Sequence, residues 1–266
     1  MKLMNPAEQM LGDGDLDGAL QALQLQVRAR PADASLRVFL FQLLSVMGRW
    51  DRALNQLTVA GELDPACLPM VQTYQPAIQC ERLRQEVFQG RRAPLLFGEP
   101  LEWVALLIEA LLLDGHGDES DAQRLRDIAF EQAPPQRGMA DGKPFAWIAD
   151  ADMRLGPVLE ALVNGRYYWV PFVHLASVAI DSPEDLRDRV WMPAQLEFAN
   201  GGTTVALIPT RYAGTDLDDG RLALARETRW HEPSPSFHIG AGQRVFATDD
   251  ADIGLMDVRA VAFDAA

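Results

Sequence analysis

The sequence predicts an α+β protein, with an α-helical repeat domain over residues 1–135 and a small α+β domain over residues 140–266. Three observations predict this organisation. Residues 14–20 and 48–54 read GDLDGAL and GRWDRAL, nearly the same heptapeptide 34 positions apart. Residues 133–144, APPQRGMADGKP, form a Pro- and Gly-rich stretch typical of a linker. Beyond it, short runs of β-branched and aromatic residues replace the long apolar segments of the first part.

The repeated heptapeptide belongs to a longer pattern of glycine, alanine and proline. The internal spacing of five and then twelve residues occurs three times, at Gly14–Ala19–Pro31, Gly48–Ala53–Pro65 and Gly117–Ala122–Pro134. A period of 34 is that of tetratricopeptide repeats, each of which is a pair of antiparallel helices. The glycine can end the first helix with a positive φ, the alanine permits close helix contact, and the proline stops the second helix. The first part is therefore expected to be a tetratricopeptide-like α-α superhelix.

The helices of this superhelix are expected at residues 35–47, 52–63 and 101–113, with one or two more within residues 66–90. Asn5-Pro6-Ala7-Glu8 is a good helix start, since it combines an Asn cap with an early Pro and a Glu. A helical solenoid usually binds a peptide or helix on its concave face. The usual repeat register places Val38, Gln42 and Ser45 on that face. The alternative is that these three residues contact only the next helix.

The second part is expected to contain a helix over residues 156–164, packed against a sheet, and a brief helix that starts at residues 182–185. Strands are predicted from the short apolar runs at 166–172, 174–180, 190–198, 203–209, 243–248 and 255–263. Asn200-Gly201-Gly202 is a hairpin turn, because these residues tolerate positive φ. Together the runs predict a small antiparallel sheet or partly open barrel of five or six strands.

The formal net charge of −14 lies entirely in the second two thirds of the chain. Residues 1–92 carry ten basic and ten acidic side chains, whereas residues 93–266 carry 14 basic and 28 acidic ones. A negative potential repels phosphate backbones and anionic lipid, so neither nucleic acid nor a membrane is expected as a partner. The sequence also lacks a long apolar stretch and a signal-peptide pattern, and we expect a cytoplasmic protein.

Catalytic motifs are not evident, and neither a cofactor nor a metal is predicted. Asp150 and Asp152 precede the predicted helix, and capping of that helix is favoured over acid–base chemistry. Arg166, Tyr167 and Trp169 combine residue types that are favoured at protein interfaces, although a strand must turn some of them into the core. The alternative function is an enzyme with an unrecognised acidic site in the C-terminal domain, using Asp150, Asp152 and Arg154.

Several stretches together resemble the ImpE family, also called TagJ, which comprises accessory proteins of bacterial type VI secretion systems. They include RVFLFQLLSVMGRWDRALNQL (37–57), FAWIADADMRLGPVLEALVNGRYYWVPF (145–172) and GGTTVALIPTRY (201–212). The resemblance implies a cytoplasmic, non-enzymatic adaptor with a distinct C-terminal domain. Its implied partners are the N-terminal helix of the small contractile-sheath subunit TssB and, through it, the disassembly ATPase ClpV. It implies no catalytic residues. A structural component that co-polymerises with the secretion apparatus is a further alternative.

Overall fold

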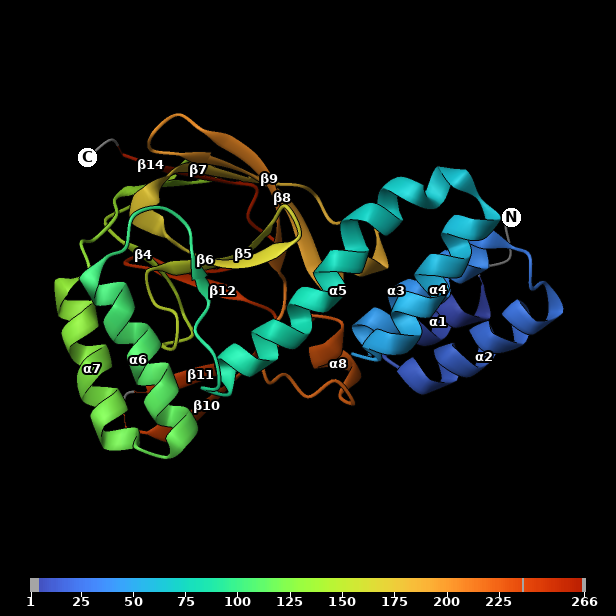
Figure 1. Cartoon of the computed structure of the whole chain (residues 1–266), viewed down its shortest axis with the longest axis horizontal. Coiled ribbons are helices and arrows are strands. Elements are labelled where there is room, and N and C mark those ends of the chain that lie inside the picture. Colours follow the sequence, from blue (N-terminus) through green and yellow to red (C-terminus); the bar gives the residue numbers. More distant parts are fainter. Residues whose placement is uncertain (1–4, 236, 265–266) are drawn as a thin grey trace.

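Figure 1 shows the computed structural model of the chain, which describes residues 5–235 and 237–264. Helices form most of the first half and strands most of the second, as predicted. The longer helices are α1 (Pro6–Asp13), α2 (Leu16–Ala29), α3 (Ala34–Val46), α4 (Trp50–Leu63), α5 (Leu68–Phe88), α6 (Glu102–His116) and α7 (Glu119–Gln132). Short helical turns are η1 (Pro65–Cys67), η2 (Phe172–His174), η3 (Leu186–Arg189) and α8 (Gly220–Ala223).

The three glycine–alanine–proline sets mark three helical hairpins, α1–α2, α3–α4 and α6–α7. Gly14, Gly48 and Gly117 follow the first helix of each hairpin with φ of +84°, +64° and +85°. The three alanines are fully buried, at 0% exposure, where the second helix meets its neighbours. The second helices end two residues before each proline. Each residue type therefore has the structural role that its spacing predicts.

Helix α5 is a single helix of 21 residues that carries Pro76 in its interior. In Figure 1 it runs diagonally from the α1–α4 hairpins toward the α6–α7 hairpin and lies against the sheet. The two-helix alternative for residues 66–90 is therefore wrong. Because α5 separates the second hairpin from the third, the three hairpins do not form one uninterrupted stack.

The strands form one large sheet and two small ones. The large sheet has the order β1-β6-β5-β9-β8-β7-β14-β2-β3, and the small ones are β13-β12-β4 and β10-β11. Strand β1 pairs with β6 in parallel, and the other pairs are antiparallel. The bounds are β1 (Leu95–Leu96), β2 (Gly138–Ala140), β3 (Lys143–Phe145), β4 (Ile148–Asp150), β5 (Val158–Val163), β6 (Arg166–Pro171), β7 (Leu175–Ile180), β8 (Trp191–Phe198), β9 (Thr203–Pro209), β10 (Thr228–Ser234), β11 (Phe237–Gly242), β12 (Val245–Thr248), β13 (Asp252–Gly254) and β14 (Ala260–Phe263).

The predicted helix over residues 156–164 is wrong, because this segment is strand β5. It pairs with β6 along its whole length and with β9 at its end, and all six of its residues are buried. A strand covered on both faces loses the alternation of apolar and polar residues that identifies a strand in sequence. The predicted count of five or six strands is also too low. The predicted turn at residues 200–202 does join β8 to β9.

The hydrophobic core is continuous between the helical hairpins and the sheet. The ring centroids of Phe41 and Tyr74 lie 5.9 Å apart, and those of Tyr74 and Trp191 lie 5.6 Å apart. These contacts connect α3, α5 and β8. The predicted boundary at residues 135–140 falls between α7 and β2, and the division into two independent domains stays a prediction.

Candidate functional site

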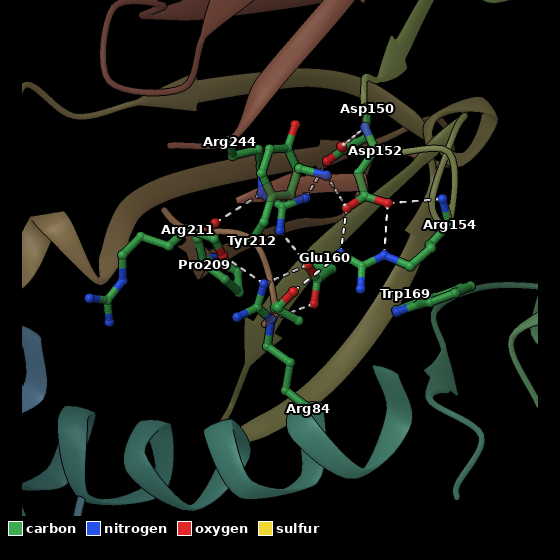
Figure 2. A network of polar contacts seen from close by, with 12 residues as sticks. Arg84, Asp150, Asp152, Arg154, Glu160, Trp169, Pro209, Arg211, Tyr212 and Arg244 are labelled. Atoms are coloured by element: carbon green, nitrogen blue, oxygen red, sulfur yellow. Dashed lines mark hydrogen bonds and ion pairs between the residues drawn. The ribbon is translucent and has the colours of Figure 1, made fainter. Parts of the chain in front are cut away.

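Glu160, near the middle of strand β5, lies at the centre of a buried set of ion pairs (Figure 2). Arg84 from α5 donates to both of its carboxylate oxygens, with Nε 2.6 Å from Oε1 and Nη2 3.0 Å from Oε2. The Tyr167 hydroxyl donates to Oε1 at 2.6 Å, and Arg244 pairs with Oε2. Arg84, Asp150, Asp152, Arg154, Glu160, Tyr167 and Arg244 are called the Glu160 network below.

The alternation of the sheet directs Glu160 toward α5. On β5, Val158 and Leu162 belong to the core shared with the helices, whereas Leu159, Ala161 and Val163 belong to the core on the opposite face. Residues two apart on a strand share a face, so Glu160 lies on the helical side with Val158 and Leu162. Trp169, paired with Glu160 on β6, donates from Nε1 to the Tyr167 hydroxyl at 2.8 Å. This contact fixes the hydroxyl that in turn donates to Glu160.

Asp150 and Asp152 brace the turn between β4 and β5, and the prediction that they cap a helix is wrong because no helix follows them. Asp150 pairs with Arg244, and its Oδ1 accepts the Asp152 N–H at 2.9 Å. Asp152 accepts from the Nε of Arg154 at 2.9 Å and from the Gly240 N–H at 3.1 Å. Both carboxylates are buried, at 3% and 0% exposure, so they are shielded from solvent.

Burial and the neighbouring charges shift the two central carboxyl groups in opposite directions. Burial alone would raise the pKa of Glu160, but the Arg84 and Arg244 guanidiniums outweigh it and lower that pKa to about 2. Burial raises the pKa of Asp150 to about 7, against the opposing attraction of Arg244. Glu160 is therefore a carboxylate at neutral pH, whereas Asp150 titrates there.

A cleft of about 370 Å³ adjoins the network between α5 and the loop of residues 211–217. Arg84, Arg154 and Arg211 line it, together with the rings of Trp50, Phe88 and Tyr212. In Figure 2 the Arg211 guanidinium lies apart from the ion pairs of the network. It instead donates to the main-chain oxygens of Val46 at 2.6 Å and Ala223 at 2.7 Å. Arg211 thus joins the C-terminal end of α3 to that of α8.

In the described ranges 5–235 and 237–264, no cluster of three or more His, Cys, Asp or Glu side chains has an arrangement that could hold a metal ion. Among the same residues, no helix combines the length and the apolar character needed to cross a bilayer.

Comparison with known proteins identifies the two parts of the chain. The family model described as ImpE protein matches residues 142–262, and a tetratricopeptide repeat model matches residues 10–75. The type VI secretion system accessory component TagJ of Pseudomonas aeruginosa is 54% identical over 259 residues, which cover 97% of this chain and 91% of that protein. The chain belongs to the ImpE family. The crystal structure of protein VPA1032 from Vibrio parahaemolyticus has the same fold, with a TM-score of 0.88, 25% identity and 97% coverage of both chains.

Membership of the ImpE family does not reveal which residues contact a partner. The six residues that were predicted to do so differ in their exposure to solvent. Gln42 and Ser45 are buried, at 7% and 0% exposure, and Val38 is partly buried. Tyr167 and Trp169 are fully buried beside Glu160, which confirms that this strand turns residues into the core. Only Arg166 of the six is exposed. Four of the six side chains are therefore covered by the chain itself, whereas contact of a partner with Val38 or Arg166 stays a prediction.

The predicted concave face is covered by the C-terminal part of this ImpE-family chain. Trp191 of β8 packs against Tyr74 of α5 and, with ring centroids 5.8 Å apart, against Trp50 of α4. The indole Nε1 of Trp191 donates to Glu81 Oε1 at 2.9 Å. Arg187 of η3 lies over the Tyr74 ring, 5.1 Å from its centroid. These contacts occupy the surface that an isolated repeat array would offer to a peptide.

Sequence reasoning missed four residues of the site: Arg84, Glu160, Arg211 and Arg244. Their partners are far away along the chain, since Arg84 and Glu160 are separated by 76 residues and Glu160 and Arg244 by 84. The one available signal was a single acidic residue within the apolar run VLEALV. A lone charge in such a run indicates a buried pair when the segment is a strand, but the helix interpretation of residues 156–164 did not single out this residue.

Proposed function

We propose that this ImpE-family protein is an accessory component of a type VI secretion system and works as an adaptor. In this proposal it binds the N-terminal helix of a TssB-like sheath subunit and thereby links the sheath to a ClpV-like ATPase. The observation that carries the proposal is the 54% identity, over 97% of the chain, to an accessory component of such a system. Tetratricopeptide repeats are typically protein-binding modules, which supports a polypeptide partner.

The geometry of the network favours an adaptor over the alternative of an acidic catalytic site. Asp150 and Asp152 are held by Arg244, Arg154 and main-chain N–H groups. Neither carboxylate lines the adjoining cleft, although Arg154 does. A general acid or base has to come within hydrogen-bonding reach of its substrate. The arrangement instead joins α5 to the sheet, which is a structural role.

The partner is tested by titrating the full chain with a peptide that copies the N-terminal helix of the sheath subunit encoded by the same organism. We expect saturable binding with a Kd in the range of about 1–50 µM, and none with a scrambled peptide. Mixing the chain, the sheath subunit and the ClpV-like ATPase should yield a ternary complex in size-exclusion chromatography. Absence of peptide binding at 10 times that range would refute the proposed partner.

A matched pair of surface variants tests the one exposed residue among the predicted contacts. Arg166→Glu reverses a charge at the start of β6, and Arg137→Glu makes the same change at an exposed position before β2. If the partner contacts the β5–β6 turn, Arg166→Glu should weaken peptide binding at least about five-fold, since a close reversed charge costs roughly 1 kcal/mol or more. Arg137→Glu should leave the affinity unchanged. Equal affinities for both variants would remove Arg166 from the contact surface.

A further inference from the structure

The arginines that line the cleft beside the Glu160 network have guanidinium N–H groups that donate to no acceptor among the described residues. Arg154 donates from Nε and Nη2 to Asp152 and from Nη2 to the Ala213 carbonyl, which leaves Nη1 without an acceptor. Arg84 uses Nε and Nη2 for Glu160, donates from Nη2 also to the Arg211 carbonyl at 2.7 Å, and makes a long contact of 3.4 Å from Nη1 to Glu81. Because a guanidinium carries five N–H donors, Arg84 retains one N–H on Nη1 and Arg154 retains both N–H groups on Nη1.

Arg211 adds a buried cation that has no carboxylate partner among the described residues. Among the described residues its acceptors are three main-chain oxygens, those of Ser45, Val46 and Ala223, and its Nε–H is unused. The side chain is only 5% exposed, and burial lowers its pKa to about 10. A buried arginine normally pairs with an anion. Arg211 lines the cleft, so an anion bound there would supply the missing charge.

Arg211 is the one cation lining the cleft that has no carboxylate partner among the described residues, because Arg84 pairs with Glu160 and Arg154 pairs with Asp152. The chain has a formal net charge of −14, but the charged residues lining the cleft are three arginines and Glu81. Glu81 is itself occupied by the Trp191 indole and by Arg84. The aromatic rings of Trp50, Phe88 and Tyr212 form the rest of a wall that combines apolar area with N–H donors.

We propose that this cleft binds one anionic group, a carboxylate or a phosphate, carried on a small apolar body. Arg211, the lining cation without a carboxylate partner among the described residues, donates its unused Nε–H to the anionic group, as arginines do in carboxylate and phosphate recognition, and Arg84 and Arg154 line the same cleft. The aromatic rings contact the apolar body. A volume of about 370 Å³ fits a small organic anion or one or two side chains of a polypeptide. The proposal concerns this site alone and does not depend on the partner proposed above.

The test uses the full chain with inorganic phosphate and phenylacetate as probes, at an ionic strength held constant with sodium chloride. We expect a saturable rise in the thermal midpoint, about 2–4 °C at ten times the Kd. Phenylacetate should bind more tightly than phosphate, since its ring has apolar surface to bury. Failure of both probes to raise the midpoint saturably up to 20 mM would overturn the proposal.

Charge variants at the mouth of the cleft keep the arginines intact. Gln85 is exposed on α5 and lines the cleft, whereas Gln79 is exposed on the same helix and does not line it. Gln85→Lys should tighten the probe Kd about five-fold and Gln85→Glu should weaken it about five-fold, as expected for one charge about 8 Å away. The same two changes at Gln79 should have no effect. Equal responses at the two positions would show general ionic binding only and would overturn the proposal.

A competition experiment identifies the source of the anionic group. If saturating phenylacetate displaces the sheath-subunit peptide, the group belongs to a carboxylate of the partner. If the peptide and phenylacetate bind together, the group belongs to a free small anion. With either result, the probe Kd should still change in the Gln85 variants. If the Gln85 variants leave the probe Kd unchanged, the proposal is overturned.

Discussion

Replacing Glu160 by glutamine should destabilise the protein strongly, because Glu160 neutralises two buried arginines. The side chain is fully buried and pairs with Arg84 and Arg244. The pKa of Glu160 is lowered from 4.5 to about 2, and this difference corresponds to about 3 kcal/mol at neutral pH. Removing one partner of a buried ion pair typically costs a similar amount, about 3–5 kcal/mol. We therefore expect Glu160→Gln to lower the free energy of unfolding by about 3 kcal/mol.

Urea denaturation at pH 7.5 measures this loss without adding salt that screens charges. With an m value of roughly 3 kcal/mol per molar, the midpoint should fall by about 1 M urea. Glu109→Gln is the matched control, because Glu109 is exposed on α6, and it should change the free energy by less than about 0.5 kcal/mol.

The pH dependence of the free energy of unfolding distinguishes the effect of removing the Glu160 charge from the effect of altered packing. Because the pKa of Glu160 is depressed, its contribution is complete above 4.5 and is lost as the pH falls toward about 2. The difference between parent and variant should accordingly narrow in acid. A loss below about 1 kcal/mol at pH 7.5, or one that does not change with pH, would refute the assignment of Glu160 as the centre of the ion pairs.

Three further substitutions test other parts of the structure. Asp150→Asn should flatten the pH profile of the free energy of unfolding, measured by urea denaturation, because a pKa raised from 3.8 to about 7 costs the parent stability as the pH rises through that interval. An unchanged urea profile between pH 5 and 8 would contradict this. Gly90→Ala should cost at least about 2 kcal/mol more than Gly14→Ala in calorimetry. Both glycines have positive φ, but a Cβ at Gly90 would lie 2.6 Å from a main-chain oxygen of α6, whereas the space around Gly14 is open. Equal losses would contradict the close contact. Arg211→Met should cost about 2–3 kcal/mol and increase amide exchange at the end of α3, since it removes hydrogen bonds from a charged donor to main-chain oxygens. Unchanged exchange there would show that Arg211 does not hold that helix end.

The helical hairpins were predictable because their signals are local. Gly14, Gly48 and Gly117 end helices by adopting positive φ, and this requirement is met within a few residues of chain. The close helix contacts at the repeated alanines follow from the same spacing. Local chemistry was therefore sufficient to predict the paired helices and their ends.

The error at β5 shows where local chemistry fails. Its residues VLEALV are mostly good helix formers, and the segment ends at Asn164-Gly165, which also ends helices. Pairing with β6 and β9 outweighs that preference, which is worth less than about 1 kcal/mol per residue. With β5 taken for a helix, Glu160 was not singled out, and Asp150 and Asp152 were interpreted as caps. One error of secondary structure thus concealed the whole Glu160 network.

The burial of Gln42 and Ser45 was not predicted for a different reason. Gln42 and Ser45 are buried, and the Ser45 main-chain oxygen accepts from Arg211, which lies 166 residues later in the chain. Repeat register predicts which face of a helix is concave, but it does not predict what the rest of the chain places there. Only the tertiary structure shows that η3, Trp191 and Arg211 occupy it.

Two arginines late in the chain donate hydrogen bonds to main-chain oxygens at the C-terminal ends of α3 and α1, so these helix ends lack their partners during most of synthesis. Arg211 binds the Val46 oxygen across 165 positions, and Arg226 binds the oxygen of Gly12 across 214 positions. At a translation rate of about 5–20 residues per second, the end of α1 emerges roughly ten to forty seconds before its arginine does. Throughout that interval the nascent hairpins expose apolar surface that the finished protein covers. The ribosome-bound chain is therefore the stage at which these hairpins expose apolar surface that a chaperone can bind.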